Sequence, residues 1–395
     1  LSSEDFARDL DFKQRPLFEV ILPMTVNADQ LIHMHKLFNK FSKFKSAEFT
    51  ADRKANTENL EVIPLVEGAK NQREIGGLLI DYVQKHQKLI GKKPDYIRVF
   101  IACSDPALTE GFITTKLSNK LALVEIQKAS DKTGVEMYPF AGAGSLPFRG
   151  GITPDTAKQF AEEFAGLRTI TLQSAFRYDY PREQVKKAVE YLNENLPKGK
   201  TESLSASDQK ILNNIADNSG KIYKQTIKQI VPDMSKFFDA VPKRRERRQH
   251  IGLLAYKRSS AGLELPRAIT FTCGFYSIGV PPEFIASGRL LAKLSEAELN
   301  LVKRFSPNLL SDFTRAGRFL NRDVLDKLAS GSSGWADVKK DIEQLSRVLK
   351  IEFSPATSEQ KEHLKLSRKI FSARDDKDKL TKLIEKSAIL RKSLG

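Results

Sequence analysis

The chain of 395 residues is 40% hydrophobic, so it can bury a large core and does not belong to the disordered class. No apolar run approaches the roughly 20 residues of a membrane span, and two cysteines make no disulfide framework, which predicts a cytoplasmic protein without a membrane partner. Lys and Arg number 65 against 49 Asp and Glu, an excess that fits a nucleic-acid-binding protein, an enzyme for small anions, or lysines that merely solvate helices.

Five short apolar runs, each followed by a segment with helical spacing, divide the first half of the chain. We expect strands at residues 17–24, 60–66, 96–102, 135–140 and 169–173, and helices at residues 29–44, 71–90, 107–128, 154–164 and 181–196. Strands that alternate with helices imply right-handed crossovers and a parallel sheet. The predicted fold class is α/β, a (β/α)8 TIM-type barrel of which this chain holds about five units. An open doubly wound sheet is the alternative. Because the chain starts at Leu1 without a methionine, we expect the remaining strands to lie upstream.

From about residue 203 the sequence changes to long amphipathic helical patterns. We therefore expect two parts, a barrel portion at residues 1–200 and a mainly helical region at residues 201–395 that packs on the barrel and completes the active site. In the second part, residues 266–276 are predicted to form a buried helix and residues 330–334 a flexible connector. The basic run at residues 243–250, with Arg247 and Arg248, is typical of a solvated face or a nucleic-acid patch.

A glycine-rich loop follows the fourth expected strand. Four glycines, Gly142, Gly144, Gly150 and Gly151, surround Arg149. Glycine tolerates positive φ and lacks a Cβ, so such a loop can bring backbone N–H groups close to an anion, and the arginine fork fits phosphate or carboxylate. A tight turn without a ligand is the alternative. After the loop, Thr-Pro-Asp at residues 153–155 predicts a helix start with an N-cap and a proline at the first helical position.

Further polar residues follow other strands, at the edge where parallel α/β proteins bind ligands. Glu67 follows the second strand, Asp105 the third, and Gln173 and Arg177 the fifth. Two carboxylates at neighbouring strand ends can hold one hard divalent cation, with waters and substrate oxygens as the other ligands. The alternatives are a helix N-terminal charge for Glu67 and an N-cap for Asp105. Because the glycine loop with Arg149 follows a strand of the same sheet, we favour the metal site over these alternatives.

Two arginines outside the loop have competing interpretations. Arg177 either contacts a substrate or pairs with Asp179. Arg267 lies in an apolar stretch, where a buried arginine needs an anion or a carboxylate partner. A structural pair with Glu264 or Glu283 is therefore the rival to a substrate anion.

Several segments of the chain resemble archaeal-type phosphoenolpyruvate carboxylase. They are residues 18–25 (Phe-Glu-Val-Ile-Leu-Pro-Met-Thr), 104–108 (Ser-Asp-Pro-Ala-Leu), the glycine loop at 140–151, 171–179 (Thr-Leu-Gln-Ser-Ala-Phe-Arg-Tyr-Asp), 266–269 (Pro-Arg-Ala-Ile) and 276–283 (Tyr-Ser-Ile-Gly-Val-Pro-Pro-Glu). The final Arg-Lys-Ser-Leu-Gly at 391–395 looks like that family's C-terminus. The likeness runs through the whole length of the chain.

The resemblance implies a carbon–carbon lyase that joins phosphoenolpyruvate and bicarbonate into oxaloacetate and phosphate, by way of carboxyphosphate and the enolate of pyruvate. It implies Mg²⁺ or Mn²⁺ held by Glu67 and Asp105, and catalytic roles for Arg149, Arg177 and Arg267. The expected substrate-binding residues are Gly144, Ser145, Gly150, Gly151, Gln173, Arg247 and Arg248. Larger relatives form tetramers and are inhibited by acidic metabolites, so we expect a homo-oligomer (dimer or tetramer) and an effector such as aspartate or malate.

The chain departs from the larger enzymes of this family at three places. Ala143 and Leu108 stand where those enzymes have an arginine and a lysine. The Gln-His-Pro-Asp-Asn segment, whose histidine assists the second step, is not in the sequence, and we expect it upstream of Leu1. The alternative functions are another metal-dependent barrel enzyme that handles phosphoenolpyruvate or pyruvate, and a basic nucleic-acid-binding protein.

Overall fold

The computed structural model describes all residues except 1–5, 8, 13–16, 50–59, 243–257 and 261. Its first half is built on a parallel sheet whose strands follow the chain order: β1 (Glu19–Leu22), β2 (Glu61–Val66), β3 (Tyr96–Ala102), β4 (Glu136–Gly142) and β5 (Thr169–Thr171). The five predicted strands are confirmed. Within the described residues they form a half-barrel, without the further parallel strands that would close a TIM-type barrel.

Helices join the successive strands, as the alternating pattern predicts. They are α2 (Ala28–Phe49), α3 (Ala69–Arg73), α4 (Ile75–Ile90), α5 (Ser104–Glu110), α6 (Phe112–Thr133), α7 (Ala157–Glu163), α8 (Ser174–Tyr178) and α9 (Arg182–Asn195). The single helices predicted after the second and third strands are each split in two. The second break falls at Gly111, which has a φ of 88° and where a Cβ would lie 2.7 Å from the Tyr223 ring. Glycine is therefore required at this break.

The second half of the chain is helical, as predicted. Its helices are α10 (Ala206–Ile230), α11 (Ser235–Asp239), α12 (Ala268–Ser277), α13 (Ser287–Leu291), α14 (Glu296–Phe305), α15 (Leu309–Gly317), α16 (Arg322–Ala329), α17 (Ser333–Leu349), α18 (Ser358–Ser372) and α19 (Lys377–Leu390), with a short antiparallel pair, β6 (Arg258–Ser260) and β7 (Leu263–Leu265). The flexible connector predicted at residues 330–334 is wrong. Helix α17 begins at Ser333, and a Cβ on Gly334 would lie 2.7 Å from Gln229 of α10, so this glycine serves close helix packing.

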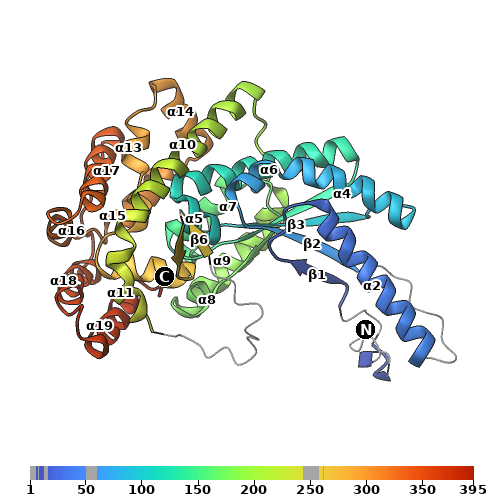
Figure 1. Cartoon of the computed structure of the whole chain (residues 1–395), viewed down its shortest axis with the longest axis horizontal. Coiled ribbons are helices and arrows are strands. Elements are labelled where there is room, and N and C mark those ends of the chain that lie inside the picture. The colour runs from blue at the N-terminus through green and yellow to red at the C-terminus, as the bar shows by residue number, and fades with distance from the viewer. Residues whose placement is uncertain (1–5, 8, 13–16, 50–59, 243–257, 261) are drawn as a thin grey trace.

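Helix α6 connects two hydrophobic cores. One core surrounds the sheet and includes Val99 and Phe160, and the other fills the helical half around Phe275 and Trp335. Every residue of α6 from 112 to 124 is buried, and its side chains enter both cores. Figure 1 shows α6 packed between α4 of the sheet half and α10 of the helical half. The two halves therefore share one buried helix.

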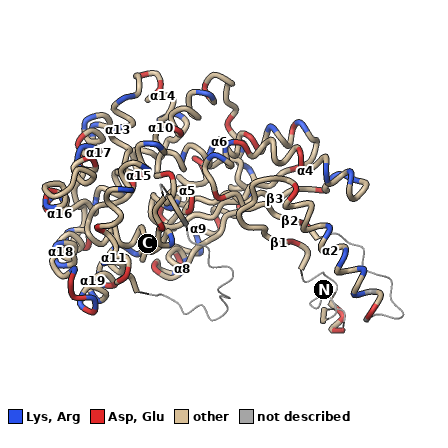
Figure 2. The backbone as a smooth tube through the Cα atoms, viewed as in Figure 1, with Lys and Arg blue, Asp and Glu red and all other residues tan. Residues whose placement is uncertain are grey.

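Charged side chains are spread along the outer helices. Figure 2 shows Lys and Arg interspersed with Asp and Glu on helices such as α2, α4 and α18. Partly exposed pairs such as Lys85 with Asp81, 2.9 Å apart, follow the i,i+4 spacing of a solvated helix face. The basic run at residues 243–250 lies outside the described residues. None of the helices that the structure describes is both long and apolar enough to cross a membrane.

Helices α2 and α4 meet at a buried cluster of His35, Tyr82 and His86. Nε2 of His35 lies 2.7 Å from the Tyr82 hydroxyl, and Nδ1 of His86 lies 2.9 Å from the backbone oxygen of Lys92. Burial and the neighbouring His86 lower the pKa of His35 to about 4, and burial also lowers the pKa of His86. Both imidazoles are therefore neutral in the folded protein near neutral pH.

We expect the free energy of unfolding to fall as the pH drops from about 6.5 towards 4. The unfolded chain takes up protons near 6.5 but the folded chain only near 4, so the unfolded state binds more protons in this window. His35 alone then contributes about 3 kcal/mol, since one pKa unit corresponds to about 1.4 kcal/mol. Urea unfolding over this range checks it: His35→Phe should flatten the pH dependence, and His33→Gln, at an exposed site on the same helix, should retain it. An unchanged pH dependence in His35→Phe would contradict the expectation.

Candidate active site

The two predicted metal carboxylates leave neighbouring parallel strands at one edge of the sheet. Glu67 directly follows β2, and Asp105 lies in the first turn of α5, just after β3; the two strands pair in register at Val66 and Ile101. The N-cap of α5 is Cys103, so the N-cap alternative for Asp105 is wrong. Among the described residues, no group of three or more His, Cys, Asp or Glu side chains could hold a metal. A cation here would need waters or substrate oxygens besides the two carboxylates, and such all-oxygen donors suit Mg²⁺.

The glycine loop is a tight turn that holds Arg149 in place. Residues Pro147–Arg149 form one turn of 3-10 helix, and Gly150 and Gly151 follow with φ angles of 112° and 79°, as expected for glycine. A Cβ on Gly150 would lie 2.6 Å from the side chain of Ala143. The backbone N–H groups of Gly144, Gly150 and Gly151 donate to oxygens within the loop. They are used in the turn, which leaves the arginine side chain as the group suited to an anion.

Arg149 joins three strand ends and the last residue of the chain. Its Nε donates to Ser104 Oγ at 3.2 Å, its Nη2 to Gln173 Oε1 at 2.7 Å, and its Nη1 to the backbone oxygen of Gly395. The side chain is only 5% exposed. Burial lowers the pKa of Arg149 to about 10, and the charge of nearby Asp105 opposes this shift. Arg149 therefore keeps its positive charge at neutral pH, beside one of the two strand-end carboxylates.

The other predicted site residues lie at different depths. Gln173 belongs to the group of residues bonded to Arg149, which with Ser104 and Gly395 we call the arginine cluster. Arg177 is exposed on α8 and lies over the ring of Tyr178, 5.1 Å from its centroid. The helix predicted after Arg267 is confirmed as α12, but Arg267 itself is exposed. Gly395 packs against the first turn of α12, where its backbone touches Ile269, so Arg267 begins a helix that borders the cluster. Arg247 and Arg248 lie outside the described residues.

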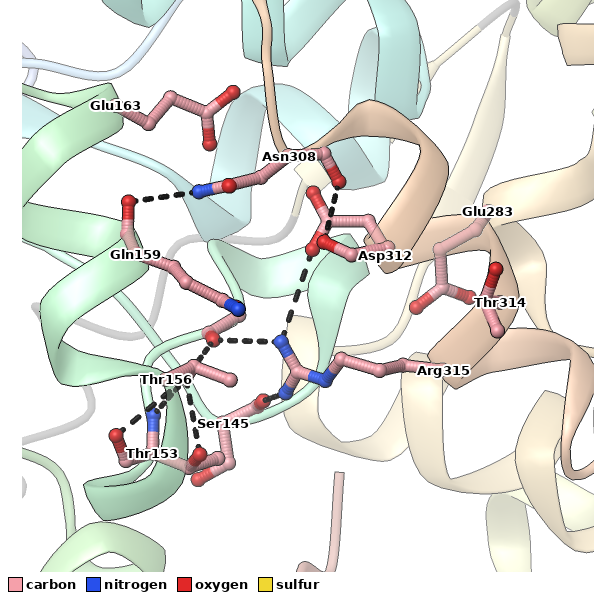
Figure 3. Close-up of polar contacts among 12 residues, drawn as sticks. Ser145, Thr153, Thr156, Gln159, Glu163, Glu283, Asn308, Asp312, Thr314 and Arg315 are labelled. Carbon is pink, nitrogen blue, oxygen red and sulfur yellow. Dashed lines mark hydrogen bonds and ion pairs between the residues drawn. The ribbon is translucent and has the colours of Figure 1, made fainter. Parts of the chain in front are cut away.

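A buried network of charges that the sequence reasoning missed supports the loop. Nζ of Lys116, on α6, lies 2.7 Å from Glu163 and 2.6 Å from Asp312, and all three side chains are less than 9% exposed. Asp312 in turn lies 3.7 Å from Arg315 of the same helix, α15. Arg315 donates to the backbone oxygens of Gly151 at 3.0 Å and Ser145 at 3.1 Å. Figure 3 shows Arg315 between Asp312 and Ser145. The sequence holds one signal of this network: Lys116 stands in an apolar helical stretch, at a position that the helical period places on the buried face.

Glu283 supports the loop from its other side. Its Oε1 accepts hydrogen bonds from the Phe148 backbone N–H at 2.8 Å and from the Tyr276 hydroxyl at 2.6 Å. Burial raises the pKa of Glu283 to about 7, and these two donors oppose the shift. Glu283 was a possible partner for Arg267, and this alternative is wrong because the carboxylate faces the loop instead.

A cavity of about 470 Å³ lies beside the loop and is rich in positive charge. Four cationic side chains outnumber two carboxylates in its lining, which includes Ser145, Arg315, Arg318, Arg391, Lys392, Asp155 and Glu359. Arg391 is buried, and its guanidinium donates to the Ser387 hydroxyl at 2.8 Å and to the Leu394 backbone oxygen at 2.7 Å. The Ser145 hydroxyl is also buried, without a hydrogen-bond partner among the described residues. These features make the cavity suitable for a small anion.

The fold and the strand-end residues define a parallel α/β protein of the kind that binds ligands at the carboxyl edge of its sheet. Residues 2–395 match the family described as "Phosphoenolpyruvate carboxylase". The whole chain is 44% identical to a protein named phosphoenolpyruvate carboxylase from Oenococcus oeni and 46% identical to one from Leuconostoc mesenteroides, and covers 78% of each. A relative of that name from Metallosphaera sedula is 32% identical over 96% of the chain and 76% of its own length. The chain therefore belongs to the phosphoenolpyruvate carboxylase family, which confirms the resemblance seen in the sequence.

We expect Lys116→Met to lower the free energy of unfolding by about 3–5 kcal/mol, because it leaves the buried Glu163 without its cation and Asp312 with only Arg315, 3.7 Å away. A triple variant that also carries Glu163→Gln and Asp312→Asn removes those charges and should recover much of the loss. Urea unfolding at neutral pH measures both changes. A single variant as stable as the parent chain would show that Lys116 does not neutralise this pair.

Proposed function

We propose that this chain carboxylates phosphoenolpyruvate with bicarbonate to give oxaloacetate and phosphate. The relatives that it matches along its whole length carry the name phosphoenolpyruvate carboxylase. The observation that carries the proposal is the setting of Arg149: a buried guanidinium, fixed by three hydrogen bonds, beside Asp105 at the ligand-binding edge of the sheet. Both substrates are small anions, and a fixed arginine fork matches phosphate and carboxylate oxygens.

The proposed reaction places new negative charge on oxygens that Arg149 can stabilise. A bicarbonate oxygen attacks the phosphorus, the bond from phosphorus to the enol oxygen breaks, and carboxyphosphate and the enolate of pyruvate form. Carboxyphosphate then separates into CO₂ and phosphate, and the enolate carbon bonds to CO₂. Donors that are already fixed stabilise such developing charge without reorganisation. Ser104 and Gln173 hold the guanidinium in place, because they accept hydrogen bonds from its Nε and its Nη2.

Glu67 and Asp105 would hold Mg²⁺ or Mn²⁺ in this proposal. Their carboxylates are the ligands that hard cations prefer, and they leave adjacent strands of one sheet. A cation bound there supplies positive charge to enolate and phosphoryl oxygens. We also assign substrate contacts to Arg177 and Arg267. Both are exposed at the rim of the arginine cluster, one on the helix that follows Gln173 and the other at the start of α12.

We further propose that the five-stranded sheet is part of a closed barrel of eight strands, with residues 1–200 as the barrel part and 201–395 as the helical part. The support is the apolar surface at the β1 edge of the sheet. Ile21 on β1 is 45% exposed, and Leu17, Phe18 and Met24 next to β1 are each 49% exposed. A gathering of large apolar side chains marks a surface that other protein segments cover.

The central test is a coupled assay of oxaloacetate formation that depends on bicarbonate and Mg²⁺. We expect Arg149→Ala to lower the rate by about 10²–10³-fold, the typical loss when one fixed donor to developing charge is removed. The matched control is Arg374→Ala, at an arginine that is 54% exposed on the helical half, and it should retain the activity. Full activity in Arg149→Ala would remove the basis of the proposal.

Asp105→Asn separates the metal role from a helix-terminal role for the carboxylate. If Asp105 is a metal ligand, the variant should need much more Mg²⁺ for half-maximal activity than the parent chain. Asp208 is also an acidic residue in the first turn of a helix, α10, and Asp208→Asn is the matched control. Equal Mg²⁺ requirements in both variants would favour the helix-terminal interpretation.

The basic cavity beside the loop is our proposed site for an acidic effector such as aspartate or malate. We expect Arg318→Gln and Lys392→Gln each to raise the aspartate concentration for half-inhibition by roughly tenfold, the effect of losing one charged hydrogen bond. The control Lys386→Gln changes an exposed lysine of α19 that does not line the cavity, and it should keep the parent response. Inhibition that is equal in all three variants would place the effector elsewhere.

A further inference from the structure

Two buried side-chain amides join the ends of strands β2 and β3. Nε2 of Gln72, on α3, donates to the backbone oxygen of Val66 at 3.0 Å and to that of Ala102 at 2.7 Å. Nδ2 of Asn119, on α6, donates to the same Ala102 oxygen at 2.9 Å and to Oε1 of Gln72 at 2.8 Å. Val66 and Ala102 are the last residues of their strands. The two amides therefore form a bridge across the point where β2 and β3 end.

The bridge has only one favourable arrangement. Each amide nitrogen has two N–H groups, and all four have a carbonyl acceptor. Turning the Gln72 amide over would point its oxygen at two carbonyl oxygens. Gln72 is 0% exposed and Asn119 is 4% exposed, so water does not replace a lost bond. Helix α3 is also tied to the helical half, because Arg73 lies 2.5 Å from Asp217 on α10.

The two proposed metal carboxylates leave the sheet at this bridge. Glu67 is the residue after Val66, and Asp105 comes three residues after Ala102. The pairing between β2 and β3 extends only to Val66 and Ile101. Beyond that pair the end of β3 is held by β4, where Ala102 lies opposite Gly142, but no ladder pairing sets the separation between the ends of β2 and β3. We propose that Gln72 and Asn119 are positioning residues that set the separation of Glu67 and Asp105 and thereby the affinity for a divalent cation. This inference rests on the proposed function, which places the cation at these two residues.

The chemistry of the cation explains why the separation matters. Mg²⁺ demands nearly octahedral oxygen ligands at about 2.0–2.1 Å, so a small shift of one strand end spoils the geometry. The amides are uncharged, and they therefore fix the backbone without competing for the cation or adding a repulsive charge. Residues that orient metal ligands without touching the metal typically change its affinity by about 10–100-fold when replaced.

The test is the dissociation constant of Mn²⁺ for the full chain, measured from the free Mn²⁺ signal by electron paramagnetic resonance, with the melting temperature recorded in parallel. The variants are Gln72→Met and Asn119→Leu, which keep the size and remove the donors. Asn321→Leu is the matched control: Asn321 is 2% exposed, and its amide donates to the Leu364 backbone oxygen at 2.9 Å in the helical half. We expect a rise in the Mn²⁺ dissociation constant of about tenfold or more in the two bridge variants. The control should show a similar drop in melting temperature and bind Mn²⁺ with the dissociation constant of the parent chain.

Two further variants, Glu67→Gln and Asp105→Asn, separate the possible failures. If these two lose Mn²⁺ binding and the bridge variants do not, the metal site stands and the positioning role is overturned. If Glu67→Gln and Asp105→Asn bind Mn²⁺ like the parent chain, the proposed metal site fails and the inference fails with it. If Gln72→Met does not fold, Asn119→Leu decides: it removes the bonds from Asn119 that orient the Gln72 amide and hold the Ala102 oxygen, while the bonds from Gln72 that help the chain to fold remain.

Discussion

The position of Arg149 depends on contacts from both halves of the molecule. Its guanidinium is bonded to residues after β3 and β5, and its third partner is Gly395, which reaches the cluster from the far end of the chain. Figure 1 shows the corresponding arrangement, with the C-terminus beside the sheet half rather than at the outer edge of the helical half. A buried arginine is costly unless its donors are satisfied. The helical half is therefore part of the site and more than a support for the sheet.

The same dependence holds for the backbone of the glycine loop. Arg315 and Glu283, both from the helical half, bond three backbone groups of the loop. The backbone N–H groups of Gly144, Gly150 and Gly151 donate to oxygens within the turn. The loop therefore offers an anion one fixed arginine side chain rather than a ring of N–H groups. Glycine is needed here for the backbone shape, at Gly150 and Gly151 above all. The loop thus holds Arg149 in position, and residues of the helical half hold the loop.

The sequence predicted those features that are local. Apolar runs such as 96–102 mark strands, and the helix start at Thr153 is confirmed with its capping box and Pro154 at the first position. Contacts between distant segments leave no local pattern. Lys116 and Asp312 are 196 residues apart and meet only in the folded chain. The apolar neighbours of Arg267 predict a buried arginine, but the structure shows it exposed. Arg267 precedes the first turn of the buried helix α12, and a residue at this position can still face the solvent.

The two edges of the candidate site are fixed by different chemistry, and the difference fits the ligands that we propose for each edge. Around the glycine loop the support is ionic, but Lys116 and Arg315 offset Glu163 and Asp312 in charge, so these four side chains add no net charge beside Arg149. The further carboxyl at the loop is Glu283, whose pKa burial raises to about 7. Around the two carboxylates the support is a pair of neutral amides. In a buried setting an unbalanced charge near either edge would shift the affinity for substrate anions or for a cation. A site that binds a cation and anions side by side, as we propose, is best held by supports without net charge. The amide pair and the network of Lys116, Arg315, Glu163 and Asp312 both meet this condition.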